Sequence, residues 1–150
     1  MLVVVVDTEA EFDWEAARPR RARGVSSVKC QDRAQRIFER YGVRPTFVLD
    51  FPVSSTPEAF EFIRDLHRSG ACEIGAHLQP WDNPPLVEQV TDENSYPGNL
   101  PFELEREKLI QLTHSIQTKS ECARAFTKQA DTASGGQLPA SSPSSATKST

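Results

Sequence analysis

Short apolar runs that end in a polar residue recur three times in the first half of the chain. They are residues 2–6 before Asp7, residues 46–49 before Asp50, and residues 72–76 before His77. A continuous β-branched run such as residues 2–6 is typical of a strand that is buried on both faces of a parallel sheet. We therefore expect three strands, each with a polar side chain at its carboxyl end.

Helical spacing of apolar residues separates these runs. A helix is expected over residues 26–41, capped by Ser26 or Ser27 and ended by Gly42, with one apolar face made of Cys30, Ala34, Ile37, Phe38 and Tyr41. A second is expected over 57–69, with a connection at 51–55 before it. Strands that alternate with helices indicate βαβ units, an α/β fold with a parallel sheet and right-handed crossover helices.

The last periodic segment is a third helix over residues 102–119, with Leu109, Leu112 and Ile116 in one stripe. Beyond it no Val or Ile occurs, and residues 135–150 are rich in Gly, Ser, Pro, Thr and Ala. We expect a domain over residues 1–119 and a disordered or unrelated tail over 120–150. Three strands and three helices make a small unit, which we interpret as the first half of a larger fold.

Composition narrows the class of protein. The 150 residues carry a formal net charge of −4, which gives no reason to expect binding to nucleic acid or to an anionic membrane. No apolar run approaches the roughly 18 residues that span a bilayer, and the first apolar run is too short for a signal peptide, so we expect a cytoplasmic protein. Three widely spaced cysteines indicate packing rather than disulfides or zinc binding.

The polar residues after the first strand are the first candidates for chemistry. Asp7 and Glu9 are two positions apart, so both side chains would point to the same side of a strand. Two carboxylates at the carboxyl edge of a sheet suit a metal ion, or a base beside a metal. The alternative is that they only begin a solvated loop.

Two loops carry further candidates. The basic residues of 18–23 could grip a phosphate or an acidic sugar, although such clusters more often form solvated loops. The proline-rich loop over 78–100 contains Trp81 and Tyr96, and long loops of this kind are often functional. We expect it to be a binding loop, whereas His67 and His114 are expected to have no part in a site.

Several ordered motifs resemble one family. The spans VVDTEAEFDW, YGVRPTFVLDFPV, EIGAHLQPWDNPP and SYPGNLP are similar to the NodB-homology polysaccharide deacetylases, in particular the WalW-like branch, over residues 2–117. The resemblance implies a (β/α) barrel, incomplete in this chain, and hydrolysis of an N-acetyl group on a carbohydrate. A divalent metal, usually zinc, would be held by an acidic residue and two histidines, and an aspartate would act as base on a water that the metal activates.

The resemblance also implies roles for individual residues. Asp7 matches the catalytic base, Glu9 the acidic metal ligand and His77 the first histidine ligand, although the roles of the two carboxylates could be exchanged. Gln79 stands where the branch has its second histidine, and an amide oxygen is a poorer ligand for zinc, so magnesium becomes more plausible. Residues expected to bind the carbohydrate substrate are Asp50, Trp81 and Tyr96.

The later motifs of the family, a strand with an arginine and a late histidine acid, have no counterpart after Ile116. Three hypotheses therefore remain open. The chain is a metal-dependent carbohydrate de-N-acetylase, or an inactive fragment that keeps a weak metal or sugar site. The third is an interaction module that uses the loop over 80–101 and self-associates through an open sheet edge.

Overall fold

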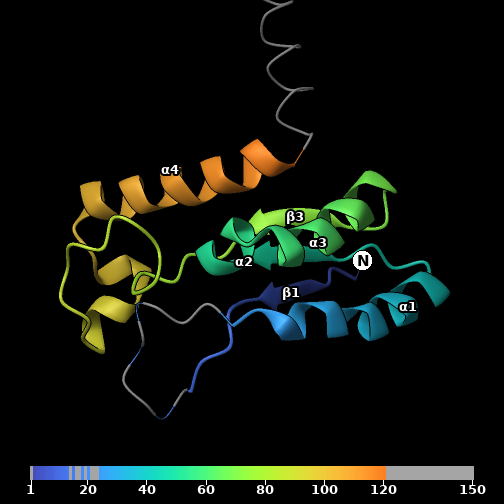
Figure 1. Ribbon diagram of the computed structural model, residues 1–150, viewed down its shortest axis with the longest axis horizontal. Coiled ribbons are helices and arrows are strands. Elements are labelled where there is room, and N and C mark those ends of the chain that lie inside the picture. The colour runs from blue at the N-terminus through green and yellow to red at the C-terminus, as the bar shows by residue number, and fades with distance from the viewer. Residues whose placement is uncertain (1, 14, 16–17, 19, 21–23, 121–150) are drawn as a thin grey trace, which may run out of the picture.

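A computed structural model gives the fold, and it describes residues 2–13, 15, 18, 20 and 24–120 (Figure 1). The elements in chain order are β1 (Val5–Thr8), η1 (Ser26–Gln31), α1 (Asp32–Arg40), β2 (Thr46–Leu49), α2 (Phe51–Ser55), α3 (Pro57–Arg68), β3 (Glu73–Ala76), η2 (Glu93–Ser95), η3 (Pro97–Asn99) and α4 (Phe102–Lys119). Helices alternate along the chain with the strands of one parallel sheet, so the expected α/β class is confirmed.

The three strands form one parallel sheet in the order β1-β2-β3. Val5 pairs with Thr46 and Asp7 with Val48, while Thr46 also pairs with Glu73 on the other side. The carboxyl ends of all three strands therefore lie at one edge of the sheet. Figure 1 shows the arrowheads of β1 and β3 pointing to the end of the molecule where the loop between β3 and α4 is folded.

The expectation that the first strand is buried on both faces is wrong. The strand begins at Val5, includes Asp7 and Thr8, and lies at an edge of the sheet, where the Val5 side chain is 57% exposed. The reason is that the helices contribute core residues to only one face. Phe47 and Leu49 on that face are fully buried, whereas Thr46 and Val48 on the other face are only partly buried.

The core lies between this covered face and four helical segments. Its buried members are Val28 of η1, Phe47 and Leu49 of β2, Val53 of α2, Ala59, Phe60 and Ile63 of α3, Cys72, and Leu112 and Ile116 of α4. Burial of the Val, Leu, Ile and Phe side chains contributes roughly 1.5–3 kcal/mol each relative to exposure. The expected packing role of Cys72 is confirmed, and this residue immediately precedes β3.

The apolar face expected for the first helix is wrong in part, because Ala34 and Phe38 are half-buried but the other three of its five residues are exposed. Ile37 is 58% exposed, Tyr41 is 71% exposed and Cys30 is exposed, whereas Val28 and Gln35 are buried. The first six residues form the 3₁₀ helix η1, in which each residue turns by about 120° instead of about 100°. The face that meets the core is therefore displaced from the one that a continuous α-helix would present.

The other helices follow the expected boundaries more closely. Pro57 opens α3 after Thr56, and Gly42 and Gly70, with φ of +64° and +78°, follow the ends of α1 and α3 as expected from C-terminal glycine caps. The segment over 51–55, expected to be a connection, forms the short helix α2. Pro52 lies in its first turn, where proline is compatible with a helix.

Helix α4 has the expected bounds, but its buried side is partly different. Leu112 and Ile116 are buried as expected, whereas Leu109 is 37% exposed and Lys108 is buried in its place. The tail expected beyond residue 120, with Cys122, lies outside the described residues. Within the described part of the chain, no helix combines the length and the apolarity that crossing a membrane requires.

Candidate functional site

The parallel sheet brings three ionisable side chains together at its carboxyl edge. Asp7 lies in β1, Glu9 follows it, and His77 comes directly after β3. Nδ1 of His77 lies 3.6 Å from Oδ1 of Asp7, and Nε2 of the same ring lies 3.6 Å from Oε2 of Glu9. The two carboxylates thus face the two nitrogens of one imidazole, although Asp7 and His77 are 70 positions apart in the sequence.

Gln79 completes this group, which we call the rim cluster (Asp7, Glu9, His77 and Gln79). Its Nε2 donates a hydrogen bond to Oε2 of Glu9, the same oxygen that faces His77. The Gln79 side chain is buried, and its Oε1 has no hydrogen-bond partner. A buried carbonyl oxygen without a partner is costly, since its hydration is lost without compensation.

The pKa of Glu9 is raised in the rim cluster, mainly by burial. Partial burial raises the pKa of Glu9, because desolvation disfavours its charged form, and the nearby Asp7 carboxylate raises this pKa further. The His77 ring acts in the opposite direction and lowers the pKa of Glu9. Asp7 is more open to solvent, with 63% of its side chain exposed. The two carboxylates of the sequence motif are therefore in different environments.

Asp50 directly follows β2 and accepts hydrogen bonds from backbone N–H groups, one of them next to the rim cluster. Its Oδ1 accepts from the Val53 N–H at 2.8 Å and caps α2, and its Oδ2 accepts from the Ala10 N–H at 2.6 Å. Burial is the largest cause that raises the pKa of Asp50, to about 6. The side chain is fully buried, so Asp50 fixes the residue next to Glu9, and its contact with a substrate stays a prediction.

A cavity of about 340 Å³ opens beside the rim cluster. Residues that line it include Arg18, His77, Gln79, Trp81, Ser95 and Tyr96. Trp81 is almost fully buried and packs edge-on against Phe12, with ring centroids 5.5 Å apart, whereas Tyr96 is exposed. The structure thus brings Trp81 and Tyr96 of the predicted binding loop to one cavity with His77 and Gln79. We call it the aromatic cavity.

Arginines of the basic stretch lie over this loop. The Arg18 guanidinium carbon is 5.7 Å from the centre of the Trp81 ring, and Arg18 also pairs with Asp92. Nη2 of Arg20 lies 3.4 Å from Oε1 of Glu88. The described arginines are therefore paired, while the remaining arginines, Arg21 and Arg23, lie outside the described residues.

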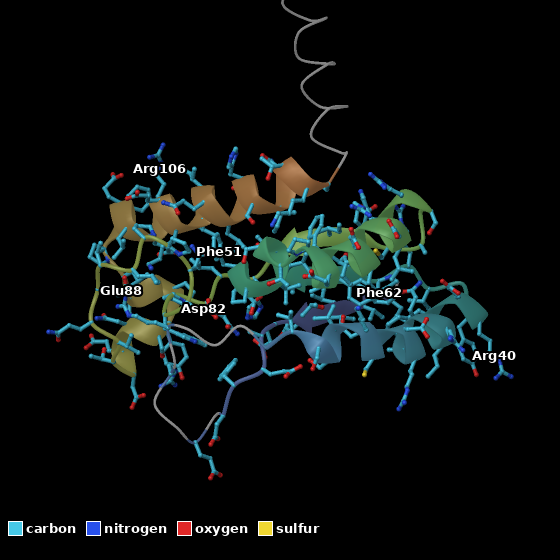
Figure 2. The ribbon with its side chains drawn as sticks, in the orientation of Figure 1. Arg40, Phe51, Phe62, Asp82, Glu88 and Arg106 are labelled. Atoms are coloured by element: carbon cyan, nitrogen blue, oxygen red, sulfur yellow. The ribbon has the colours of Figure 1, made fainter. Side chains whose placement is uncertain are left out.

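Lys108 of α4 binds the loop over residues 78–100 through hydrogen bonds, a role that was not predicted from the sequence. Its Nζ donates to three loop carbonyl oxygens, those of Pro80 (3.0 Å), Asn83 (2.7 Å) and Pro85 (2.6 Å). Asn83 in return donates to the Lys108 carbonyl at 2.9 Å. A signal was present, because Lys108 precedes Leu112 and Ile116 by one and two helical repeats on the buried stripe. Figure 2 labels Asp82 and Glu88 of the same loop, on the side of the molecule where the loop between β3 and α4 is folded.

The rim cluster has part of the geometry that a divalent-cation site requires. Ligands of one tetrahedral zinc lie about 3.3 Å apart, since each bond is about 2.0–2.1 Å long. The 3.6 Å between Nε2 of His77 and Oε2 of Glu9 is close to that separation, and the unpartnered Oε1 of Gln79 is a further donor. However, no group of three His, Cys, Asp or Glu side chains among the described residues is arranged to hold a metal ion.

The other two histidines lie apart from the rim cluster. Nδ1 of His67 lies 3.1 Å from the Cys72 carbonyl oxygen at the start of β3, which fits the expected structural role. His114 is exposed on α4, as expected. Comparisons of the chain with family models, with curated proteins and with solved structures find no significant match.

Proposed function

We propose that this chain carries the amide-hydrolysing site of a carbohydrate de-N-acetylase that depends on a divalent cation. The observation that carries the proposal is the convergence of Asp7, Glu9 and His77, with both carboxylates 3.6 Å from one imidazole. The three-stranded sheet, covered by helices on one face, is compatible with a segment of a (β/α) barrel, the fold that we propose for the complete domain.

Glu9 and His77 are the residues that would hold the cation, and zinc fits their nitrogen and carboxylate donors. The Oε1 of Gln79 would add an oxygen ligand, which magnesium also accepts. When bound, such an ion would lower the pKa of a water to about 7 and polarise an amide carbonyl.

Asp7 is the proposed general base. Its side chain is the more exposed of the two carboxylates, so water can reach it. Oδ1 of Asp7 faces Nδ1 of His77, and a carboxylate on that nitrogen would fix the tautomer that leaves Nε2 free to bind a cation. Asp7 would thus take a proton while it also orients the ring.

The aromatic cavity is the proposed seat of the sugar. Its volume, about 340 Å³, is at the lower end of the range for small-molecule sites. Trp81 and Tyr96 would supply apolar faces for the sugar ring, next to His77, where the N-acetyl group would have to lie.

The test is acetate release from N-acetylglucosamine oligomers by the full chain, measured with added zinc, cobalt or magnesium. We expect activity that Asp7→Asn lowers by at least about 100-fold, in line with general-base catalysis. His114→Gln is the matched control, because His114 is exposed and lies outside the rim cluster. No acetate release with any of the three metals would contradict the proposal.

A second function is favoured by one contact, the hydrogen bond from Nε2 of Gln79 to Glu9. This bond uses the Glu9 oxygen that a cation would need, so the site would bind the sugar without cleaving its amide. In that case calorimetry would detect sugar binding that is unchanged by a chelator, and no acetate would appear.

A further inference from the structure

The aromatic cavity has an arginine in its lining. Arg18 is 24% exposed at its side chain, so its guanidinium is partly accessible rather than fully covered. It lies over the Trp81 ring, at 5.7 Å from the centre, which holds the planar group across a wall of the cavity. A neutral sugar could accept hydrogen bonds from this guanidinium, but only an anionic ligand would balance its charge.

The present partner of Arg18 shows which anion this position accepts. Nη1 of Arg18 donates to Oδ1 of Asp92, a carboxylate from a segment 74 residues further along the chain. The Asp92 side chain is 93% exposed, and ion pairs of this kind contribute little to stability because water and salt screen them. Loss of the pair with Asp92 therefore costs little free energy, so a ligand carboxylate held within the cavity keeps most of what its contact with Arg18 contributes.

The carboxylates of the rim cluster do not take up this charge. Asp7 and Glu9 both face His77, and Glu9 also accepts from Gln79. Arg20, the other described arginine of the basic stretch, is paired with Glu88. Arg18 is thus the cation of this loop that lines the cavity, and its charge is balanced by a group that a ligand can displace.

We propose that Arg18 makes the aromatic cavity selective for N-acetylated sugars that bear a carboxylate, which takes the place of Asp92. The inference rests on the proposed function, because the N-acetyl group is what the rim cluster would act on. The planar guanidinium suits a planar carboxylate through two parallel hydrogen bonds, whereas a lysine offers only a point charge. The sugar ring would lie between Arg18 and His77, both of which line the cavity.

The test compares ligands that differ in one charge. Binding of N-acetylmuramic acid, of its methyl ester and of N-acetylglucosamine to the full chain is measured by calorimetry at low salt. We expect the free acid to bind about tenfold more tightly than the ester, as one charge-assisted contact would give. This ratio should fall to about one in Arg18→Gln and to an intermediate value in Arg18→Lys.

Two further variants make the result specific. Asp92→Asn removes the competing carboxylate, so the preference for the acid should increase. Arg36→Gln removes a guanidinium on α1 that pairs with Asp32, and it should leave the ratio unchanged. If Arg18→Gln fails to fold, the Asp92→Asn result still decides the question.

The outcomes separate this inference from the proposed function. Equal binding of acid and ester by the wild-type chain overturns the selectivity but leaves the de-N-acetylase proposal intact. A preference that survives Arg18→Gln also overturns it. Failure to bind or hydrolyse any of these sugars overturns both proposals.

Discussion

The ammonium of Lys108 lies 3.2 Å from Oε2 of Glu88, and both side chains are buried. A buried charge is tolerated when it is paired and fully hydrogen-bonded, and three loop carbonyls complete the surroundings of this ammonium. Burial lowers the pKa of Lys108, and Glu88 acts against this shift. The contact joins α4 to the loop that carries Trp81 into the aromatic cavity.

Lys108→Met should destabilise the fold by about 3–5 kcal/mol, because it removes the buried cation beside Glu88 and the donor to three loop carbonyls, and leaves Glu88 only its longer contact with Arg20. Urea unfolding measures the change. The double variant Lys108→Met with Glu88→Met should recover much of the loss, since the buried carboxylate is then removed together with Lys108 and Arg20 keeps partial access to water.

The control for this prediction is Arg106→Gln on the same helix. Arg106 is exposed, and Figure 2 shows it projecting from α4 away from the sheet. Its loss should change the free energy of unfolding by less than about 0.5 kcal/mol. An equally small effect for Lys108→Met would mean that the buried contact does not hold the loop.

Asp50 should make stability fall as pH rises from about 4 to about 6. Its pKa is raised to about 6 in the fold, above its ordinary value of 3.8, mainly by burial. In this window the native state binds more protons than the unfolded state, so the free energy of unfolding decreases with increasing pH, by at most about 3 kcal/mol.

The measurement is urea unfolding at pH 4.5 and pH 7.5 for the wild type and Asp50→Asn. The variant has no proton to lose, so its stability relative to the wild type should improve at the higher pH. At the lower pH it should be less stable, because an amide nitrogen would face the N–H of Ala10 or of Val53. If the free energy of unfolding changed equally with pH in the two proteins, Asp50 would not be the source of the pH dependence.

Gln79→His should strengthen the binding of zinc by about tenfold or more, because imidazole is a better zinc ligand than an amide. It would also remove the hydrogen bond by which Nε2 of Gln79 occupies Glu9. Calorimetry with zinc gives the affinities, and His77→Gln in the same background should abolish the gain. If the affinity does not rise, Glu9 and His77 are not zinc ligands.

Self-association through β1 is expected, because this strand lies at an edge of the sheet and Val5 is largely exposed. Val5→Lys should lower the apparent mass at high protein concentration in light scattering, since a charge on an edge strand opposes strand pairing. Val87→Lys, in an exposed loop position, is the matched control. A wild-type chain that is monomeric at all concentrations would contradict this expectation.

The pattern of apolar and polar residues along the chain was sufficient to predict the parallel sheet and the proximity of Asp7, Glu9 and His77. Strands at 46–49 and near 72–76 were predicted because their apolar runs are short and bounded by turn residues. Once the strands are parallel, side chains that follow them lie at one edge. The contacts of His77 with Asp7 and Glu9 are a consequence of that geometry.

Which surfaces are covered depends on how the elements pack in three dimensions. The 3₁₀ start of the first helix turns Ile37 and Tyr41 to solvent, and no sequence period records that change of phase. The exposure of Val5 depends on what packs beside it, which a local apolar run does not specify. Lys108 is buried because carbonyls far from it in the chain converge on its ammonium, and such convergence is a property of the folded loop, not of the residue.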